Sequence, residues 1–168
     1  MTDAALGRLD EFPRLRHLDL SHEWIGRAGI EEIARQTSLE RLSLQDLPII
    51  DADLAPLARL PQLRELRLSG TWLRGAFLAN LENSPLELLQ MDCQNLDERN
   101  LEHLAKMPAL DSIYLSHCPI TDVGAKALGK LGTVRVLRID GSRLSGAARE
   151  ELRRRVPGVV FADEDASP

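Results

Sequence analysis

The 168-residue sequence is poor in cysteine and in aromatic residues. Its two cysteines, Cys93 and Cys118, are too few for the disulfide frameworks or cysteine-rich caps of many secreted repeat proteins. We therefore expect a reducing, cytoplasmic setting. Aromatic residues make up 4% of the chain, whereas hydrophobic residues as a whole make up 43%, so the core must be largely aliphatic.

The sequence also lacks long apolar runs and an excess of positive charge. No stretch approaches the ~20 consecutive apolar residues of a membrane span, and the first residues lack the basic and apolar regions of a signal peptide. The net charge is −5. An acidic chain without a basic stripe is a poor match for nucleic acid or for an anionic membrane surface, so we expect neither as a partner.

The dominant feature of the chain is a repeat. A Leu-x-x-Leu-x-Leu-like hexad starts each of six repeats, at Leu15, Leu39, Leu63, Leu86, Leu110 and Val134. Four of the five intervals between these starting positions are 24 residues long, and one is 23. Such a period indicates a stack of similar units rather than a globule around one pocket. Each hexad is predicted to be a short strand whose fourth and sixth residues point inward. A helical stretch follows, and in repeat five Thr121 and Asp122 are suited to cap its start.

The run Ile120-Thr121-Asp122-x-Gly124 with Leu128 resembles leucine-rich repeat proteins, in particular the bacterial subtype whose helix starts with Thr-Asp. The ribonuclease-inhibitor and F-box groups are more distantly similar. The resemblance covers nearly the whole chain and implies an α/β fold, a curved solenoid with a concave parallel sheet of about six short strands and convex helices. The family's inward polar residue at the ninth position of the repeat is matched by Thr71 and Cys118, whereas Glu23 and Leu47 depart from it.

The repeats divide the chain into three predicted parts. Residues 1–14 match the helical half of a repeat, with Thr2-Asp3 aligned to Thr121-Asp122, and are expected to form an N-terminal half-repeat or cap. Residues 15–156 contain the six leucine-rich repeats, and residues 157–168 a C-terminal edge strand at Val159-Val160-Phe161 followed by an acidic tail. The start in mid-repeat leaves two explanations open, an improvised cap or a chain cut from a longer protein.

Equal positions in successive repeats become neighbours about 5 Å apart, so they form columns on the surface. The column at position two largely alternates in sign and is typical of a solvated ladder of ion pairs; it contains Arg16, Glu40, Arg64, Glu87, Asp111 and Arg135. Positions three and five are charged in the first repeats but include Leu88, Tyr114 and Val136 in repeats four to six. We predict that these three residues, flanked by Arg138 and Arg67, bind a partner protein. The alternative is scattered surface apolar residues without a function.

Both tryptophans of the chain, Trp24 and Trp72, occupy position ten, with Pro48 in the repeat between them. They are predicted either to seal the rim of the solenoid or to form a second protein-binding site, because tryptophan is enriched in such sites.

One pair of residues hints at chemistry. Cys93 and His117 share position eight, where a thiol beside an imidazole can become a nucleophile, and Cys118 and Asp92 are near enough in the repeat to suggest zinc. However, position nine points inward, and neither a pocket nor a zinc spacing motif is present. We therefore predict no enzyme, no metal and no cofactor.

The sequence favours a non-enzymatic, monomeric protein-interaction scaffold that binds another protein through its concave face, as an adaptor, an inhibitor or an immunity-type subunit. The first alternative is the recognition or sensor fragment of a larger leucine-rich repeat protein. A more distant one is a thiol or zinc enzyme around Cys93 and His117.

Overall fold

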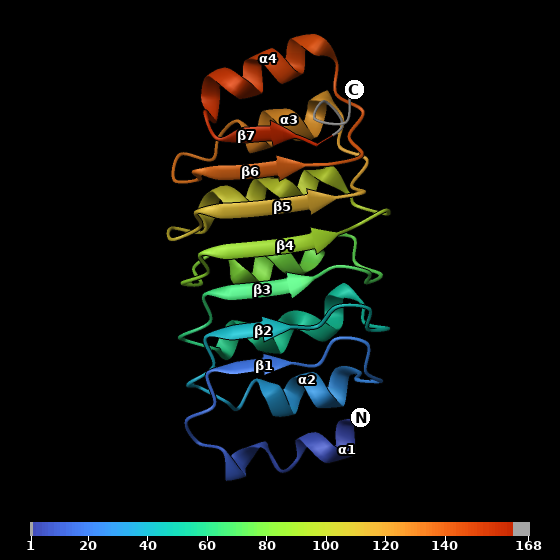
Figure 1. The fold of residues 1–168 in the computed structure, drawn as a ribbon, viewed down its shortest axis with the longest axis vertical. Coiled ribbons are helices and arrows are strands. Elements are labelled where there is room, and N and C mark those ends of the chain that lie inside the picture. The colour runs from blue at the N-terminus through green and yellow to red at the C-terminus, as the bar shows by residue number, and fades with distance from the viewer. Residues whose placement is uncertain (1, 163–168) are drawn as a thin grey trace.

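Each repeat contributes one strand and one helical segment to a solenoid (Figure 1). The structure is a computed structural model that describes residues 2–162. One parallel sheet contains the described strands in chain order: β1 (His17–Asp19), β2 (Arg41–Ser43), β3 (Glu65–Leu68), β4 (Leu88–Asp92), β5 (Ser112–Ser116), β6 (Val136–Ile139) and β7 (Val159–Phe161). The first six strands coincide with the hexads, which confirms the predicted α/β leucine-rich repeat solenoid; β7 adds a seventh.

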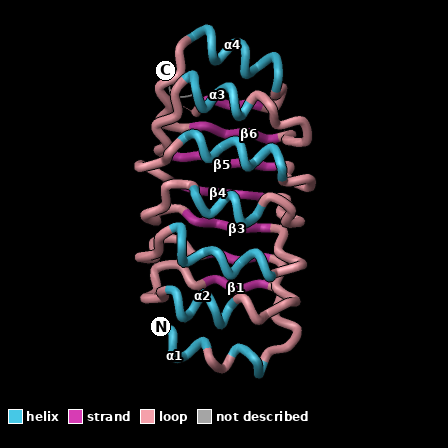
Figure 2. The backbone as a smooth tube through the Cα atoms, turned by 180° about the vertical axis from the view of Figure 1, so that it is seen from behind, coloured by secondary structure: helices cyan, strands magenta, loops and turns pink. Residues whose placement is uncertain are grey.

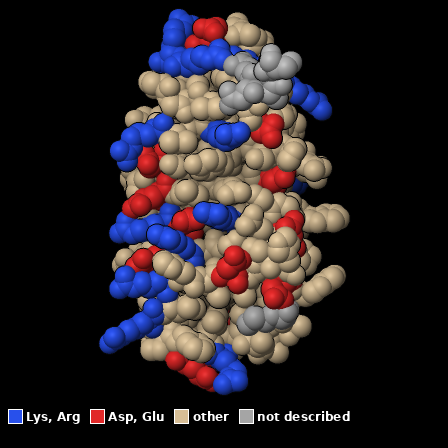
Figure 3. All heavy atoms as spheres, in the orientation of Figure 1, with Lys and Arg blue, Asp and Glu red and all other residues tan. Residues whose placement is uncertain are grey.

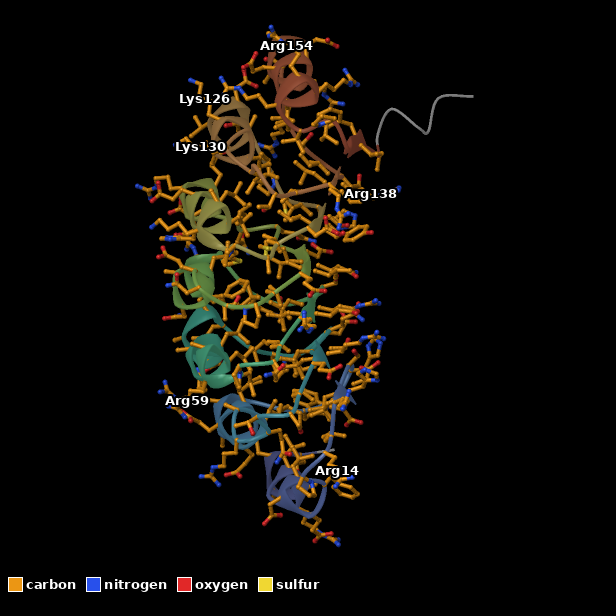
Figure 4. All side chains as sticks on the ribbon, turned by 90° about the vertical axis from the view of Figure 1, so that its left-hand side faces the viewer. Arg14, Arg59, Lys126, Lys130, Arg138 and Arg154 are labelled. Carbon is orange, nitrogen blue, oxygen red and sulfur yellow. The ribbon has the colours of Figure 1, made fainter. Side chains whose placement is uncertain are left out.

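The helical segments line the opposite side of the sheet (Figure 2). They are α1 (Asp3–Leu6), η1 (Leu9–Glu11), α2 (Arg27–Ile33), η2 (Asp51–Arg59), η3 (Ala76–Leu81), η4 (Glu98–Lys106), α3 (Asp122–Leu128) and α4 (Gly146–Arg155), where η marks a 3₁₀ helix. In the side view the row of helices bows outward, and the row of strands lies on the inside of the arc (Figure 4). The strand face is therefore the concave one.

The helical geometry differs among the repeats. Repeats one, five and six contain α-helices, whereas repeats two to four contain the 3₁₀ helices η2, η3 and η4. In η2, Pro56 has no N–H to offer to an α-helical hydrogen bond. The helix η3 belongs to the repeat of 23 residues, which has one residue fewer in which to form its convex segment. The sequence predicted helical segments here, and the tighter winding is a finding of the structure.

The core is a column of aliphatic side chains between the sheet and the helices. Its aromatic members are Phe77 and Phe161, and the inward strand residues Leu66 and Leu89 are fully buried. Leu18 points inward as well but is only partly buried, because β1 is an edge strand with a neighbour on one side. No helix among residues 2–162 is long and apolar enough to cross a membrane.

Acidic side chains at helix starts join four pairs of consecutive repeats, counting the N-terminal half-repeat. The carboxylate at position 13 accepts a hydrogen bond from the backbone N–H at position 12 of the following repeat in four places: Asp3 from Gly26 at 2.9 Å, Asp51 from Arg74 at 2.8 Å, Glu98 from Thr121 at 2.8 Å and Asp122 from Ser145 at 2.8 Å. These bonds satisfy N–H groups that a helix start leaves without an intrahelical partner.

The helix cap predicted for repeat five is confirmed for Thr121, whose hydroxyl oxygen accepts a hydrogen bond from the N–H of Val123 at 3.2 Å. Asp122 was expected to cap the same helix, but its carboxylate instead binds Ser145 of the next repeat. Gly124 permits the close contact with the preceding repeat, because a Cβ at this position would lie 2.8 Å from Oε2 of Glu98.

The two ends of the described chain continue the pattern of the repeats. Asp3 binds Gly26 as Asp122 binds Ser145, which agrees with the alignment of Thr2-Asp3 to Thr121-Asp122. At the other end, β7 pairs with β6, and the guanidinium groups of Arg149 and Arg153 lie 4.8 and 5.1 Å from the ring centroid of Phe161. Apart from Ala162, the predicted acidic tail lies outside the described residues.

Candidate functional site

The strand register defines two outward columns on the concave face. Over the later strands, position three is occupied by Glu65, Leu88, Ser112 and Val136, and position five by Gln90, Tyr114, Arg138 and Val160. Side chains at these positions point away from the helices because successive residues of a strand alternate between its faces. The outward columns therefore form the surface that a partner would meet on this side of the molecule.

The first half of this face is polar, and its side chains bind one another. The guanidinium of Arg67 donates a hydrogen bond to Glu65 at 2.6 Å, and Arg41 lies 3.7 Å from the same carboxylate. The hydroxyl groups of Ser21 and Ser43 are 2.8 Å apart. Charge and hydrogen bonding over β1 to β3 are thus largely satisfied within the chain.

The second half of the face is less charged (Figure 3). Val136 and Val160 are 37% and 38% exposed, and Leu88 and Tyr114 are partly buried. We call these four residues the strand-face patch. Leu88, Tyr114 and Val136 were predicted to lie side by side, but Leu88 on β4 and Val136 on β6 are two steps apart in the sheet, with Ser112 of β5 between them. Tyr114, on the strand between them, lies diagonally to both and is the centre of the patch.

The two arginines predicted to flank the patch differ in their surroundings. Arg138 is the direct neighbour of Tyr114 on β6, and no ion pair of its guanidinium occurs among residues 2–162. It projects from the strand side of the solenoid (Figure 4). Arg67, also predicted to flank the patch, lies on β3 diagonally to Leu88 of β4, and its guanidinium is held by Glu65.

Val160 belongs to the patch, although the sequence did not predict it as part of the binding surface. It pairs with Arg138 in the register of β6 and β7 and so extends position five by one strand. The signal was present in the sequence, because the alternation of the predicted edge strand Val159-Val160-Phe161 places its middle residue outward when Phe161 is buried.

The ladder of ion pairs predicted at position two is confirmed at the edge where the strands begin. Arg16 pairs with Glu40 at 3.1 Å, Arg64 with Glu87, and Arg135 with Asp111 at 2.5 Å. The hydrogen bond from Arg135 lowers the pKa of Asp111 below its usual value. Exposed pairs of this kind contribute little stability, and they neutralise one border of the face.

The proposed chemistry of Cys93 with His117 does not form. Cys93 is fully buried and shares a hydrogen bond with the thiol of Cys118; this contact and burial raise the pKa of Cys93. His117 is exposed, and its Nδ1 lies 3.0 Å from Oδ2 of Asp92, which raises the pKa of His117. A thiol that is buried and harder to ionise, next to an imidazole that is held by Asp92, is the opposite of an activated nucleophile. In the described part of the chain, no group of three or more His, Cys, Asp or Glu is placed to hold a metal.

The backbone explains why Cys93 departs from its column. Position eight has a positive φ in the other five repeats, at His22, Asp46, Gly70, His117 and Gly141, but not at Cys93. The turn of repeat four therefore has a different geometry, and Cys93 occupies an inward place beside Cys118. Cys118 is fully buried, as position nine predicted.

The tryptophans at position ten do not seal the rim. Trp24 is 78% exposed and Trp72 is 74% exposed, so neither ring is covered by the repeat stack. Together with Pro48, His22, Glu23 and neighbouring residues they line a hollow of about 370 Å³. The sealing role is therefore not observed, and the role of the tryptophans as a second protein-binding site stays a prediction.

Comparisons with known proteins agree with this architecture. A family model described as a leucine-rich repeat matches residues 108–129, the segment that contains the Ile120-Thr121-Asp122-x-Gly124 run. A search of curated protein sequences found no significant match.

Two solved structures similar to this chain are internalins from Listeria monocytogenes. One is 18% identical with a TM-score of 0.57, over 92% of this chain and 49% of the internalin. The other, internalin C2, is 19% identical with a TM-score of 0.42, over 96% of this chain and 84% of its own. The chain thus spans about half the length of the first internalin, and that likeness supports the fold.

Proposed function

We propose that this leucine-rich repeat chain is a non-enzymatic scaffold that binds another protein through its concave strand face, with Tyr114 at the centre of the contact. The observation that carries the proposal is the contrast between the two halves of that face. Over β1 to β3 the charged side chains bind one another, whereas over β4 to β7 Leu88 and Val136 lie diagonally to Tyr114, and Arg138 beside it has no ion pair among residues 2–162. Apolar groups on an outer sheet face add nothing to the core and favour association when a partner covers them.

The composition of the strand-face patch fits a protein partner. Interface centres are rich in tyrosine and arginine and poor in paired charge, and a polar border excludes water from them. Here Tyr114 supplies a flat ring with a hydroxyl group, Arg138 supplies donors for a carboxylate or carbonyl of the partner, and the pair Arg135–Asp111 lies at the border. The role as adaptor, inhibitor or immunity-type subunit of a monomeric, cytoplasmic protein is part of this proposal.

The test uses a protein that co-purifies with the chain from its native host. In titrations with that protein, Tyr114→Ala is expected to weaken binding by at least ~2 kcal/mol, about thirtyfold, and to leave thermal stability little changed. Glu32→Ala, on the convex helix α2, is the matched control and is expected to bind as the unaltered chain does. Tyr114→Ala binding as tightly as the control, with binding lost in Trp24→Ala or Trp72→Ala, would place the interface at the rim.

A further inference from the structure

An apolar group separate from the strand-face patch stands at the rim where the first three strands end. It consists of Trp24, Pro48, Ile50 and Trp72, which we call the rim group. All four side chains are exposed, with 55% for Ile50 and about three-quarters for each tryptophan. Exposed aromatic rings of this size in one place are uncommon on a surface that has no binding role.

The neighbouring residues fix the direction of the rim group. Position eleven is buried in each of the three repeats, as Ile25, Ile49 and Leu73. With this residue anchored in the core, the preceding side chain at position ten is turned to solvent. Trp24 is held further by a parallel backbone bridge to Thr2. The two rings are therefore presented by an ordered backbone, so a ligand need not order a loop to reach them.

The spacing of the two tryptophans points to the shape of the ligand. Trp24 and Trp72 follow strands β1 and β3, which are two steps apart in the sheet, so their backbones are separated by about 10 Å. A polyproline II helix repeats every three residues with a rise of about 3.1 Å each, about 9 Å per turn. A peptide in this conformation, lying along the axis of the solenoid, offers an equivalent residue to each tryptophan.

The hydrogen-bonding groups are complementary as well. No hydrogen bond of either indole N–H occurs among the described residues. A polyproline II helix has no internal hydrogen bonds, so its carbonyl oxygens are free to accept from these indole groups. Pro48, in the repeat between the two tryptophans, adds an apolar surface and has no N–H group that would compete for the carbonyl oxygens of the ligand.

The charge around the rim group indicates what should accompany the prolines. The hollow of about 370 Å³ between the tryptophans is lined by the carboxylates of Glu23 and Asp46 and by one imidazole, His22. His22 lies 3.1 Å from Asp46. Asp46 is 52% exposed and its partner is an imidazole, so its carboxylate can still be reached by a lysine or arginine next to the prolines.

We propose that the rim group binds a basic, proline-rich segment of a partner protein in the polyproline II conformation. Prolines three residues apart lie against Trp24 and Trp72, and a lysine or arginine of the segment lies beside Asp46. This surface is independent of the strand-face patch, so the two proposals fail separately.

The experiment titrates the full chain with an arginine-flanked oligoproline peptide of about nine residues, three turns of polyproline II. Both tryptophans of the chain belong to the rim group, so intrinsic fluorescence reports its occupation directly. A saturable change in emission is expected. Trp24→Ala and Trp72→Ala, followed calorimetrically, are each expected to weaken binding by about tenfold or more, while circular dichroism stays that of the unaltered chain.

Three controls make the result specific. A glycine-serine peptide with the same arginine flanks is expected not to bind. Tyr114→Ala is expected to bind the oligoproline peptide normally. The double variant Pro48→Trp/Trp72→Ala keeps two tryptophans but places them one step apart, about 5 Å, and is expected not to restore binding.

The proposal is overturned by any of four results of the titrations. These are no saturable change in emission, equal binding of the glycine-serine peptide, equal loss in Tyr114→Ala, and normal binding by the double variant. A shift in the emission of the free chain on dilution would also overturn it, because a second copy would then cover the rim group.

Discussion

The carboxylate of Glu98 lies against the backbone of Thr121, one repeat further along the chain. It accepts hydrogen bonds from the N–H of Thr121 at 2.8 Å, from the Thr121 hydroxyl at 2.8 Å and from the N–H of Gly124 at 3.0 Å. Parallel strands are joined by their backbones, whereas neighbouring helices are joined here by acidic side chains. Helix packing in this solenoid therefore depends on a few carboxylates as well as on the leucine core.

Glu98→Ala removes the acceptor of three hydrogen bonds and leaves the start of α3 without that cap. We expect a loss of about 1–2 kcal/mol in the free energy of unfolding, the usual effect of losing a helix cap. Chemical denaturation measures it. Glu102→Ala, on the exposed side of the same helix η4, is the control and should change stability by less than about 0.5 kcal/mol. Equal effects of the two variants would contradict the role given to Glu98.

Asp122 makes the same kind of contact, and it should make stability depend on pH. Hydrogen bonds from the N–H and hydroxyl of Ser145 lower the pKa of Asp122 below its ordinary value of 3.8. The Asp122 carboxylate therefore binds a proton more readily in the unfolded chain than in the folded chain. Its contribution to the free energy of unfolding is present above about pH 3.8, the unfolded pKa, and is lost as the pH falls through the lower pKa of the folded chain. Denaturation curves of Asp122→Asn should show lower stability at neutral pH and a smaller fall in acid. Parallel pH profiles of the two proteins would refute this.

The period-two interpretation of the strands is tested by two adjacent leucines on β4. Leu89 is fully buried, so Leu89→Ala should cost about 2–5 kcal/mol through the lost contacts and the cavity that remains. Leu88 points to the concave face, and Leu88→Ala should cost about 1 kcal/mol or less. Thermal or denaturant unfolding gives both values. A reversed order would mean that the strand faces are assigned wrongly.

The thiols should be unreactive in the folded chain. Their contact raises the pKa of Cys93 and lowers that of Cys118, but both thiols are fully buried, so a reagent cannot reach either of them in the folded chain. We expect a thiol-specific reagent to modify the folded chain slowly and the denatured chain rapidly. If a thiol of the folded chain were modified rapidly, and His117→Ala abolished this modification, the result would support a thiol activated by His117.

Much of the fold was predictable because the regular spacing of the hexads along the sequence determines how the repeats stack. The spacing of the hexads places each leucine of a strand beside its counterpart in the next strand, so Leu42, Leu66 and Leu89 pair as the columns require. The N-cap role of Thr121 was equally local, since it depends on neighbouring residues of one turn. Contacts that follow directly from the repeat spacing or from the residues of a single turn could be predicted from the sequence alone.

The errors concern side chains with a choice between neighbours. Asp122 is close enough to its own helix and to Ser145, and the bond to Ser145 forms. Arg67 was expected to offer its guanidinium to a partner at the edge of the patch, and Glu65 on the same strand binds it. The inward place of Cys93 depends on a turn that lacks the left-handed residue of the other repeats. Such choices depend on backbone detail that a repeat pattern does not specify.

The central claim, that a partner covers the concave face at Tyr114, can be tested with a single label. Tyr114 is the one tyrosine of the chain, so incorporation of fluorotyrosine gives one ¹⁹F signal from the centre of the strand-face patch. On addition of the co-purifying partner, we predict that this signal shifts or broadens saturably, with the same midpoint as binding measured by calorimetry. An unchanged tyrosine signal in a chain that calorimetry shows to be saturated with partner would contradict the account.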